Sequence, residues 1–181
     1  MQDVNDNAPV FERNEYIVNL VESLPINSQV LQVTALDHDT GNNARLTYHF
    51  KTDNFTEQTK IFGIYPNSGL IYLKKSLDRE SRDKYSLVVA ATDNGTPAST
   101  ATARVYITVL DVNDNDPKFS REKYVFSVEE NLPRGSFIGK VSAVDSDVGS
   151  NAVVRYGFIL TNSSFQINPS SGKFHLFVFW L

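Results

Sequence analysis

The 181-residue chain is 41% hydrophobic and 12% aromatic, which is enough to bury one or two ordinary cores and disfavours a disordered protein. Its formal charge of −4 includes no block of like charge, so it lacks the electrostatic footprint of a nucleic-acid or anionic-membrane binder. The absence of cysteine excludes disulfides, thiolate metal sites and thiol catalysis.

The first seven residues are polar and turn-like, and no apolar run approaches the roughly 18 residues that span a bilayer. We therefore expect any signal peptide or membrane anchor of the parent protein to lie outside this sequence. Apolar residues then alternate with polar ones at 16–20, 46–50, 85–91 and 103–109, a period typical of half-buried strands. Turn-forming residues separate these segments and no long helical periodicity occurs, so the sequence predicts an all-β sandwich of about 100 residues.

The sequence repeats internally. Segment 3–9, DVNDNAP, returns 108 positions later as segment 111–117, DVNDNDP. Farther on, PNSG at 66–69 matches PSSG at 169–172 with a separation of 103, so a loop of the second copy is five residues shorter. Such a period indicates that one repeat is one domain.

The second copy is incomplete in this sequence. At the separation of 103, Leu181 falls where Asp78 stands, so the strands predicted at 85–91 and 103–109 have no counterparts. We expect the second copy alone to be poorly stable, because its sheet edges and core are exposed. The expected organisation is a linker remnant at 1–7, a complete repeat at 8–110, a linker at 111–117, and an incomplete repeat at 118–181 with a divergent apolar tail from about 177.

The residues shared by the two copies are mostly Asp, Glu and Asn at strand ends and turns. Calcium takes six to eight oxygen ligands with loose geometry, whereas zinc asks for other donors. The run from Asp111 to Asn115 offers several such oxygens within five residues, and Pro117 favours an extended exit. The pattern predicts a calcium site at a hinge between two domains.

These motifs resemble tandem cadherin repeats over residues 1 to about 176. The resemblance rests on the D-x-N-D-N-x-P linker, on Glu22 in VESLP, on DHD at 37–39, on LDRE at 77–80 and on ATDNG at 91–95. It implies a seven-stranded Greek-key β-sandwich for each repeat, with three calcium ions clamped between consecutive repeats.

At matching positions the resemblance implies ligands drawn from both repeats. The implied side-chain ligands of this main junction are Glu22, Asp78, Glu80, Asp111, Asn113, Asp114, Asp145 and Asp147. The implied backbone carbonyl ligands are those of Val112, Asn115 and Asn151. The third ion would lack one carboxylate, because the counterpart of Asp93 is not in the sequence.

A half-built site is also implied near the amino end. Its members match the ligands that the later of two repeats gives to a calcium site between them. The preceding repeat is not in this sequence, so we expect weak calcium binding at most. They are Asn5, Asn7, Asp37, Asp39, Asn43 and Asp93.

Two rival functions fit the sequence less well. An EF-hand loop beginning at Asp111 would end at Glu122, but Asp116 stands where that loop requires glycine and predicted strands flank it. A secreted hydrolase using Asp39 would resemble half of an aspartic-protease dyad, yet the equivalent Asp147-Val148-Gly149 lacks the hydroxyl. We expect no enzyme and no catalytic residue.

The sequence therefore predicts a calcium-dependent cell–cell adhesion module. It would belong to the extracellular part of a plasma-membrane protein, where calcium stiffens the repeats for homophilic or heterophilic recognition of other cadherin-type ectodomains. The resemblance implies a partner-swapping tryptophan near the start of a classical cadherin, but the only tryptophan here is Trp180. Its position favours internal repeats of a Fat-, Dachsous- or protocadherin-like molecule. Asn54 and Asn162 are candidate glycosylation sites, whereas the triplet at Asn94 overlaps the calcium motif.

Overall fold

A computed structural model describes residues 3–51, 57–159 and 164–177. The chain divides into two compact units, Met1–Val112 and Asn113–Leu181, called here the first and second unit. Strands dominate both units, and the short helix α1 (Glu57–Ile61) lies in the first. Among the described residues, no helix is both long enough and apolar enough to cross a membrane.

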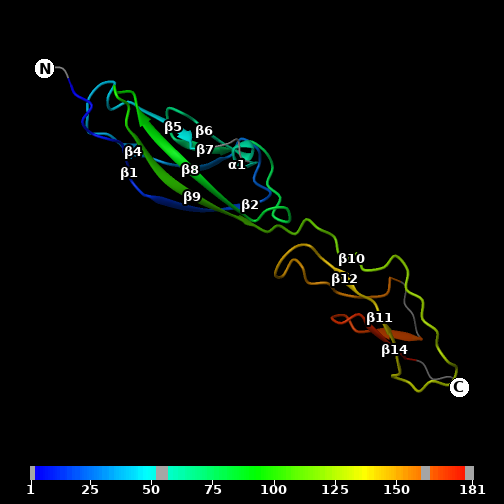
Figure 1. The fold of residues 1–181 in the computed structure, drawn as a ribbon. Helices are drawn as coiled ribbons and strands as arrows, with labels where there is room; N and C mark the ends of the chain where they lie inside the picture. The colour runs from blue at the N-terminus through cyan, green and yellow to red at the C-terminus, as the bar shows by residue number, and fades with distance from the viewer. Residues whose placement is uncertain (1–2, 52–56, 160–163, 178–181) are drawn as a thin grey trace. The chain divides into compact units, whose positions relative to one another are not determined.

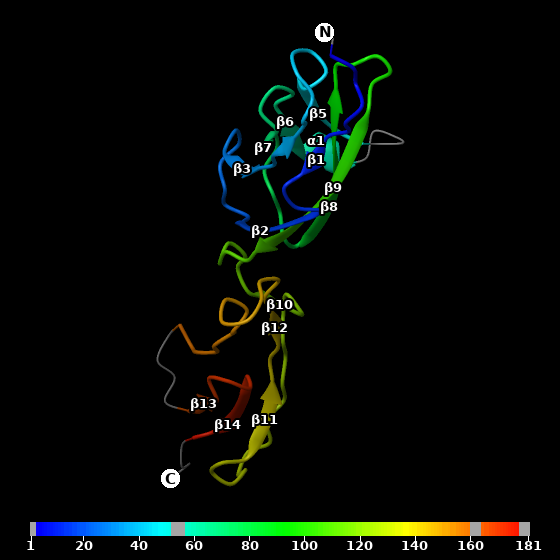
Figure 2. The same ribbon diagram turned by 90° about the vertical axis from the view of Figure 1, so that its left-hand side faces the viewer.

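The first unit is a β-sandwich (Figures 1 and 2). One sheet has the order β2-β9-β8-β5, formed by β2 (Glu15–Val21), β9 (Thr100–Leu110), β8 (Lys84–Asp93) and β5 (Leu46–Phe50). The other has the order β3-β7-β6, formed by β3 (Gln29–Gln32), β7 (Leu70–Leu73) and β6 (Phe62–Ile64). The short strands β1 (Val10–Phe11) and β4 (Ala35–Leu36) pair separately. The four segments predicted to be strands from period-two alternation lie within β2, β5, β8 and β9, which confirms that prediction.

The strands are held by alternating side chains that meet between the sheets. Tyr16 and Leu20 of β2, with Val105 and Ile107 of β9, are buried together with Phe62 and Ile71 from the facing sheet. Burying each such side chain contributes roughly 1.5–3 kcal/mol relative to leaving it exposed. Strand β2 runs parallel to β9, while β9 runs antiparallel to β8, so the first and last long strands lie side by side.

The second unit contains five short strands among its described residues. They are β10 (Lys118–Phe119), β11 (Phe137–Lys140), β12 (Ala143–Val144), β13 (Phe165–Ile167) and β14 (Lys173–Leu176). β10 pairs with β12, and β11-β14-β13 form a three-stranded sheet, in which β11 lies beside β14 (Figure 2). Residues 123–129, the counterpart of β2, form no strand, and Val125 is 75% exposed. Strands equivalent to β8 and β9, which hold β2 and β5 in the first unit, have no counterpart in this sequence.

The two units reproduce each other's contacts at the repeat separation. Tyr48 Oη accepts from the backbone N of Ala35 at 3.0 Å, and Tyr156 Oη accepts from that of Ala143 at 2.9 Å. Gly69 and its counterpart Gly172 both have positive φ, 72° and 64°, and both pack against a backbone carbonyl that a Cβ would strike. The repeated glycine is therefore required by backbone conformation and by space.

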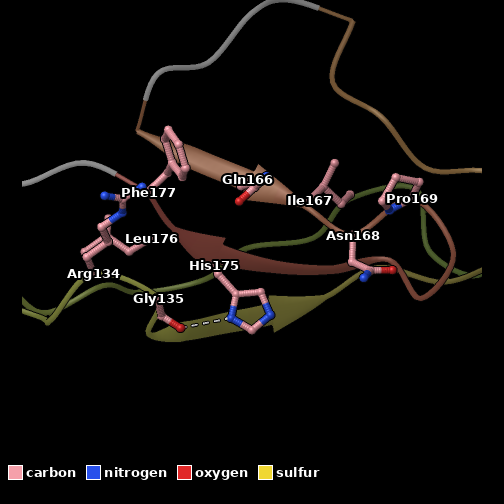
Figure 3. A pocket seen from close by; sticks show the side chains of 9 residues that line it. All are labelled: Arg134, Gly135, Gln166, Ile167, Asn168, Pro169, His175, Leu176 and Phe177. Atoms are coloured by element: carbon pink, nitrogen blue, oxygen red, sulfur yellow. Dashed lines mark hydrogen bonds between the residues drawn. The ribbon is translucent and has the colours of Figure 1, made fainter.

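A shallow pocket of about 380 Å³ opens beside β13 and β14 (Figure 3). His175 on its wall lies with Nδ1 3.1 Å from the Gly135 carbonyl oxygen. The guanidinium of Arg134 stacks over the Phe177 ring at 4.7 Å. Neither a carboxylate nor a hydroxyl side chain is among the described residues that line the pocket.

Candidate metal centre

The parallel pairing of β2 and β9 brings acidic residues together at one end of the first unit. Val21 pairs with Leu110 at the last position of this ladder, so Glu22 and Asp111 leave the sheet at the same edge. The Glu22 backbone N donates to the Leu110 carbonyl oxygen at 3.1 Å, and the Val112 backbone N donates to Glu22 Oε1 at 2.8 Å. Glu22 is only 6% exposed, and glutamates are rarely buried to this degree unless they are paired.

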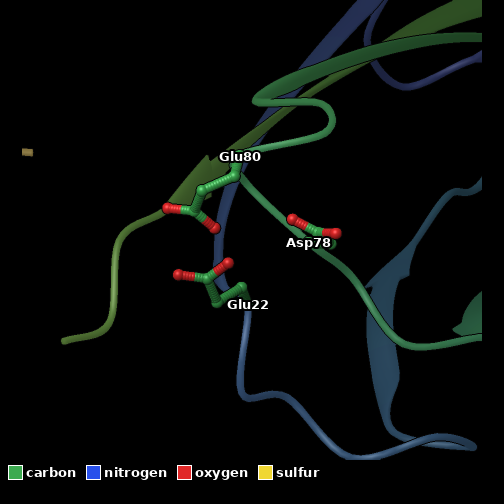
Figure 4. A group of neighbouring side chains, drawn as sticks. All are labelled: Glu22, Asp78 and Glu80. Carbon is green, nitrogen blue, oxygen red and sulfur yellow. The ribbon is translucent and has the colours of Figure 1, made fainter. Parts of the chain in front are cut away.

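Two further carboxylates reach this edge from the turn between β7 and β8. Glu22, Asp78 and Glu80 each present one oxygen, and these oxygens all lie within 4.8 Å of one another (Figure 4). Two like charges about 4 Å apart repel by about 1 kcal/mol in water and about 4 kcal/mol at an effective dielectric constant of 20. A cation bound among these hard oxygen donors would remove that cost, and oxygen donors are those that calcium prefers.

Hydrogen bonds from the same turn hold Asp78 in its charged form. The hydroxyl of Ser81 donates to Asp78 Oδ2 at 2.7 Å, and the backbone N of Ser81 donates to Asp78 Oδ1 at 3.0 Å. These bonds, that of the hydroxyl foremost, lower the pKa of the Asp78 carboxyl. Asp78 is thus ionised at neutral pH and able to act as a cation ligand.

The second unit carries its own acidic cluster after β12. The backbone N of Asp147 donates to Asp145 Oδ1 at 2.9 Å, and the Asn115 side-chain amide donates to Asp147 Oδ1 and to Asp114 Oδ1, each at 2.8 Å. Asp147 is 4% exposed, and its Oδ2 has no hydrogen-bond partner within the described part of the chain. Because a buried, unsatisfied carboxylate oxygen is costly, this atom fits the coordination of a cation.

The amino-terminal residues form the same arrangement around Asp39. Its backbone N donates to Asp37 Oδ1 at 3.0 Å, and the side-chain amide of Asn7 donates to Asp39 Oδ1 at 2.6 Å. Asp37 Oδ2 is buried and has no hydrogen-bond partner among the residues that the structure describes. Equivalent hydrogen bonds are therefore present in both units.

Asp93 anchors the other side of this amino-terminal group and is 2% exposed. It accepts hydrogen bonds from the backbone N of Gly95 at 2.9 Å and of Ser99 at 3.0 Å, and both its oxygens lie 3.3 Å from the Asn5 side-chain nitrogen. Asp93 and Asn5 are thus brought together.

One residue of this group was missed by the sequence reasoning. Asp3 Oδ2 accepts from the Asn43 side-chain amide and from the Thr40 backbone N, both at 3.0 Å, and the bond from Thr40 is the main cause of the lowered pKa of Asp3. The signal was available, because Asp3 is the repeat counterpart of Asp111, which was assigned as a ligand.

The structure also places the remaining predicted positions, and the ligand role of every predicted residue stays a prediction. Asn113 begins the second unit, and Asn151 lies in the turn after Asp147, where its backbone N donates to the Val148 carbonyl oxygen at 3.2 Å. The carbonyl ligands expected at Val112, Asn115 and Asn151 stay predictions. Asn54 and Asn162 lie outside the described residues. Residues 111–122 follow the end of β9 and include β10, not the helices of an EF-hand.

Tandem repeats of a β-sandwich with oxygen-donor clusters at their ends define a modular class of proteins. The sequence matches the Cadherin domain over residues 16–110 and 124–179, and the chain belongs to the cadherin family. It is 56% identical over 182 residues to "Protein dachsous" of Drosophila melanogaster and 43% identical over 173 residues to "Protocadherin Fat 4" of Homo sapiens. Each match covers 96% of this chain, which spans only 5% and 3% of those two proteins.

Solved structures give the same result for the fold. Mouse Cadherin-23 EC22-24 matches with a TM-score of 0.86 at 34% identity, covering 97% of this chain and 55% of that one. The structure described as a Protocadherin gammaB7 EC3-6 cis-dimer matches with a TM-score of 0.88 at 28% identity, covering 98% of this chain and 44% of that one. The all-β fold and the non-classical character of the repeats were thus both predicted correctly from the sequence.

Proposed function

We propose that this chain is a pair of extracellular cadherin repeats that binds calcium where one repeat meets the next and serves in cell–cell adhesion. The observation that carries this proposal is the convergence of Glu22, Asp78 and Glu80, which come from two separate segments of the first unit. Membership of the cadherin family supports it, as do the buried carboxylate oxygens of Asp37 and Asp147 that have no hydrogen-bond partner among the described residues. The named relatives are cadherins, and we assign the chain no enzymatic activity.

In the proposed junction, both units contribute ligands and residues 111–117 form the linker. The first unit would supply Glu22, Asp78, Glu80 and Asp111. The second would supply Asp114, Asp145 and Asp147, with Asn113 and the carbonyls of Val112, Asn115 and Asn151 completing the coordination. Calcium, when bound, supplies positive charge and cross-links oxygens from the two repeats.

The charge balance gives the proposed function its physical basis. The seven carboxylates among these residues carry seven negative charges, which oppose a close approach of the two repeats without a cation. Three calcium ions, the number that the family resemblance implies, would leave about one negative charge. Extracellular calcium modules bind with a Kd of about 10⁻⁴ to 10⁻³ M, so such a junction is filled outside the cell. At a concentration ten times Kd, each site stabilises the bound state by about 1.4 kcal/mol.

We extend the proposal to partners and location on the strength of the family. The stiffened repeats would present a surface to other cadherin-type ectodomains, of the same or another kind, within a plasma-membrane protein. The gammaB7 structure, which is described as a cis-dimer, supports pairing between ectodomains as a mode available to the fold. Asn5, Asn7, Asp37, Asp39, Asn43 and Asp93, now joined by Asp3, would form the lower half of a further junction and bind calcium weakly alone.

Calorimetric titration of the chain with calcium, after removal of metal by chelation, tests the proposal. We expect saturable binding with a Kd of about 10⁻⁴ to 10⁻³ M in the unmodified chain. Glu22→Gln should lose most of this binding, whereas Glu15→Gln, an exposed carboxylate at the start of the same strand, should keep it. Absence of calcium binding up to several times 10⁻³ M by the unmodified chain would refute the proposed function.

A further inference from the structure

Arg79 places a positive charge inside the acidic cluster of the first unit. Its Nε lies 2.5 Å from Asp111 Oδ1, and its Nη2 forms an ion pair with Glu80 Oε1. Its backbone N donates to Glu22 Oε2 at 2.7 Å. One residue thus bonds three of the four carboxylates at this edge, two through its guanidinium and one through its backbone.

The side chains in these ion pairs are largely withdrawn from solvent. The side chain of Arg79 is 12% exposed, that of Asp111 is 10% exposed and that of Glu80 is 22% exposed. The planar guanidinium presents several N–H donors in a rigid fork, which suits two carboxylates that arrive from different directions. Here Glu80 comes from the turn before β8, and Asp111 comes from the end of β9. Such charge-assisted hydrogen bonds are stronger than those between neutral groups.

The same carboxylates are needed by the proposed calcium ions. Asp111 and Glu80 have lone pairs that either a guanidinium or a calcium ion would engage, and a divalent cation beside Arg79 would be repelled by it. We propose that Arg79 is a built-in counter-cation, which holds the cluster together without metal and must release Asp111 and Glu80 when calcium binds. This inference rests on the proposed function, because it assigns a role in regulating the same site.

Competition between Arg79 and calcium stabilises the metal-free cluster and destabilises the calcium-bound one. In the metal-free state, Arg79 reduces repulsion among the carboxylates and keeps them close to one another. In the bound state, its release costs free energy that would otherwise appear as affinity for calcium. Arg79 therefore raises the calcium concentration at which the site fills, and it leaves the empty cluster ordered.

Calcium titration of substituted chains tests this role. Arg79→Gln should tighten calcium binding by about tenfold, because it removes the competing charge and its two ion pairs. Arg79→Lys keeps the charge without the fork and should fall between the unmodified chain and Arg79→Gln. The matched control is Arg82→Gln, which removes the same charge from the same turn. Arg82 Nε donates to the Lys84 carbonyl oxygen at 2.9 Å, and its guanidinium lies 4.7 Å from the centre of the Tyr85 ring. This control should change calcium affinity less than twofold.

The outcomes separate this inference from the proposed function. If the unmodified chain binds calcium and Arg79→Gln leaves the affinity unchanged or weaker, the counter-cation role is wrong and the calcium site stands. If the unmodified chain binds no calcium, both are wrong.

A second measurement needs only the unmodified chain as its test sample. The Arg79 Nε–H resonance should be protected from solvent exchange without calcium, and it should lose that protection when calcium saturates the site. The resonance is assigned to Arg79 by its absence from the spectrum of Arg79→Lys, which has no guanidinium Nε–H at this position. A resonance whose protection does not change on saturation with calcium would overturn the inference, even if the substituted chains fold poorly.

Discussion

The buried carboxylate of Glu22 should stabilise the first unit even without metal. Its two oxygens accept from the backbone N of Arg79 at 2.7 Å and of Val112 at 2.8 Å, and it ties the turn before β8 to the end of β9. Replacing it with alanine leaves two partly buried N–H donors without this acceptor, at about 1–3 kcal/mol each. We expect Glu22→Ala to lower the free energy of unfolding by about 2–4 kcal/mol in the presence of a chelator, after allowing for some rehydration.

Urea unfolding followed by tyrosine fluorescence measures this effect. Glu15→Ala is the matched control, since Glu15 is the exposed first residue of the same strand, and we expect a change within about 0.5 kcal/mol. A chelator in both samples separates the hydrogen-bonding role of Glu22 from any role as a calcium ligand. If Glu22→Ala differs from Glu15→Ala by less than about 0.5 kcal/mol, the two hydrogen bonds do not stabilise the fold as reasoned here.

Three further predictions concern the turn glycine, an acid-linked carboxylate and the second unit. Gly69→Ala should lower the free energy of unfolding by about 2–4 kcal/mol, because Gly69 has a φ of 72° and an added Cβ would lie 2.5 Å from the Val33 carbonyl oxygen. Its control is Gly41→Ala, since Gly41 also has positive φ but an added Cβ would meet no atom within 4 Å. Gly41→Ala should lower the free energy of unfolding by only about 1 kcal/mol in the same urea experiment. Because folding lowers the pKa of Asp78, its contribution is present above the unfolded pKa and is lost as pH falls through the folded value. With chelator present, the free energy of unfolding of Asp78→Asn should therefore fall less steeply between about pH 4 and pH 2 than that of the unmodified chain. Equal slopes of unfolding free energy against pH would contradict this. Hydrogen exchange should be faster at 123–129 than in β2, its counterpart, and equal protection would show that the missing ladder is not what orders this segment.

The sequence predicted the long strands well because their period-two pattern is local. It could not predict that β2 pairs in parallel with β9, since that contact joins residues about ninety positions apart. Segment 123–129 shows that period-two alternation alone does not ensure a strand. Tyr124, Phe126 and Val128 repeat the alternation of β2, yet the segment forms no strand, because pairing depends on partners that alternation does not reveal.

For the candidate site, the sequence indicated which acidic residues to expect but not how they are hydrogen-bonded. The repeat drew attention to Glu22 and Asp147, and the family resemblance implied Asp78; the structure places each of the three beside other carboxylates. What spacing could not supply was the hydrogen bonding around them. The contacts of Arg79 depend on where its side chain lies in the folded chain, and an arginine does not mark a calcium ligand set.

The parallel pairing of β2 with β9 also determines how the first unit bears mechanical load. Strand β9 leads directly to Asp111, so tension that enters the unit through this end acts along the strand axis. That strand is held by β2 over seven paired residues and by β8 over nine. Because the inter-strand bonds lie across the direction of pull, the two ladders are loaded in shear and their bonds share the force, instead of opening one after another from an end. The sheet that positions the acidic cluster thus also makes its attachment point resistant to pulling.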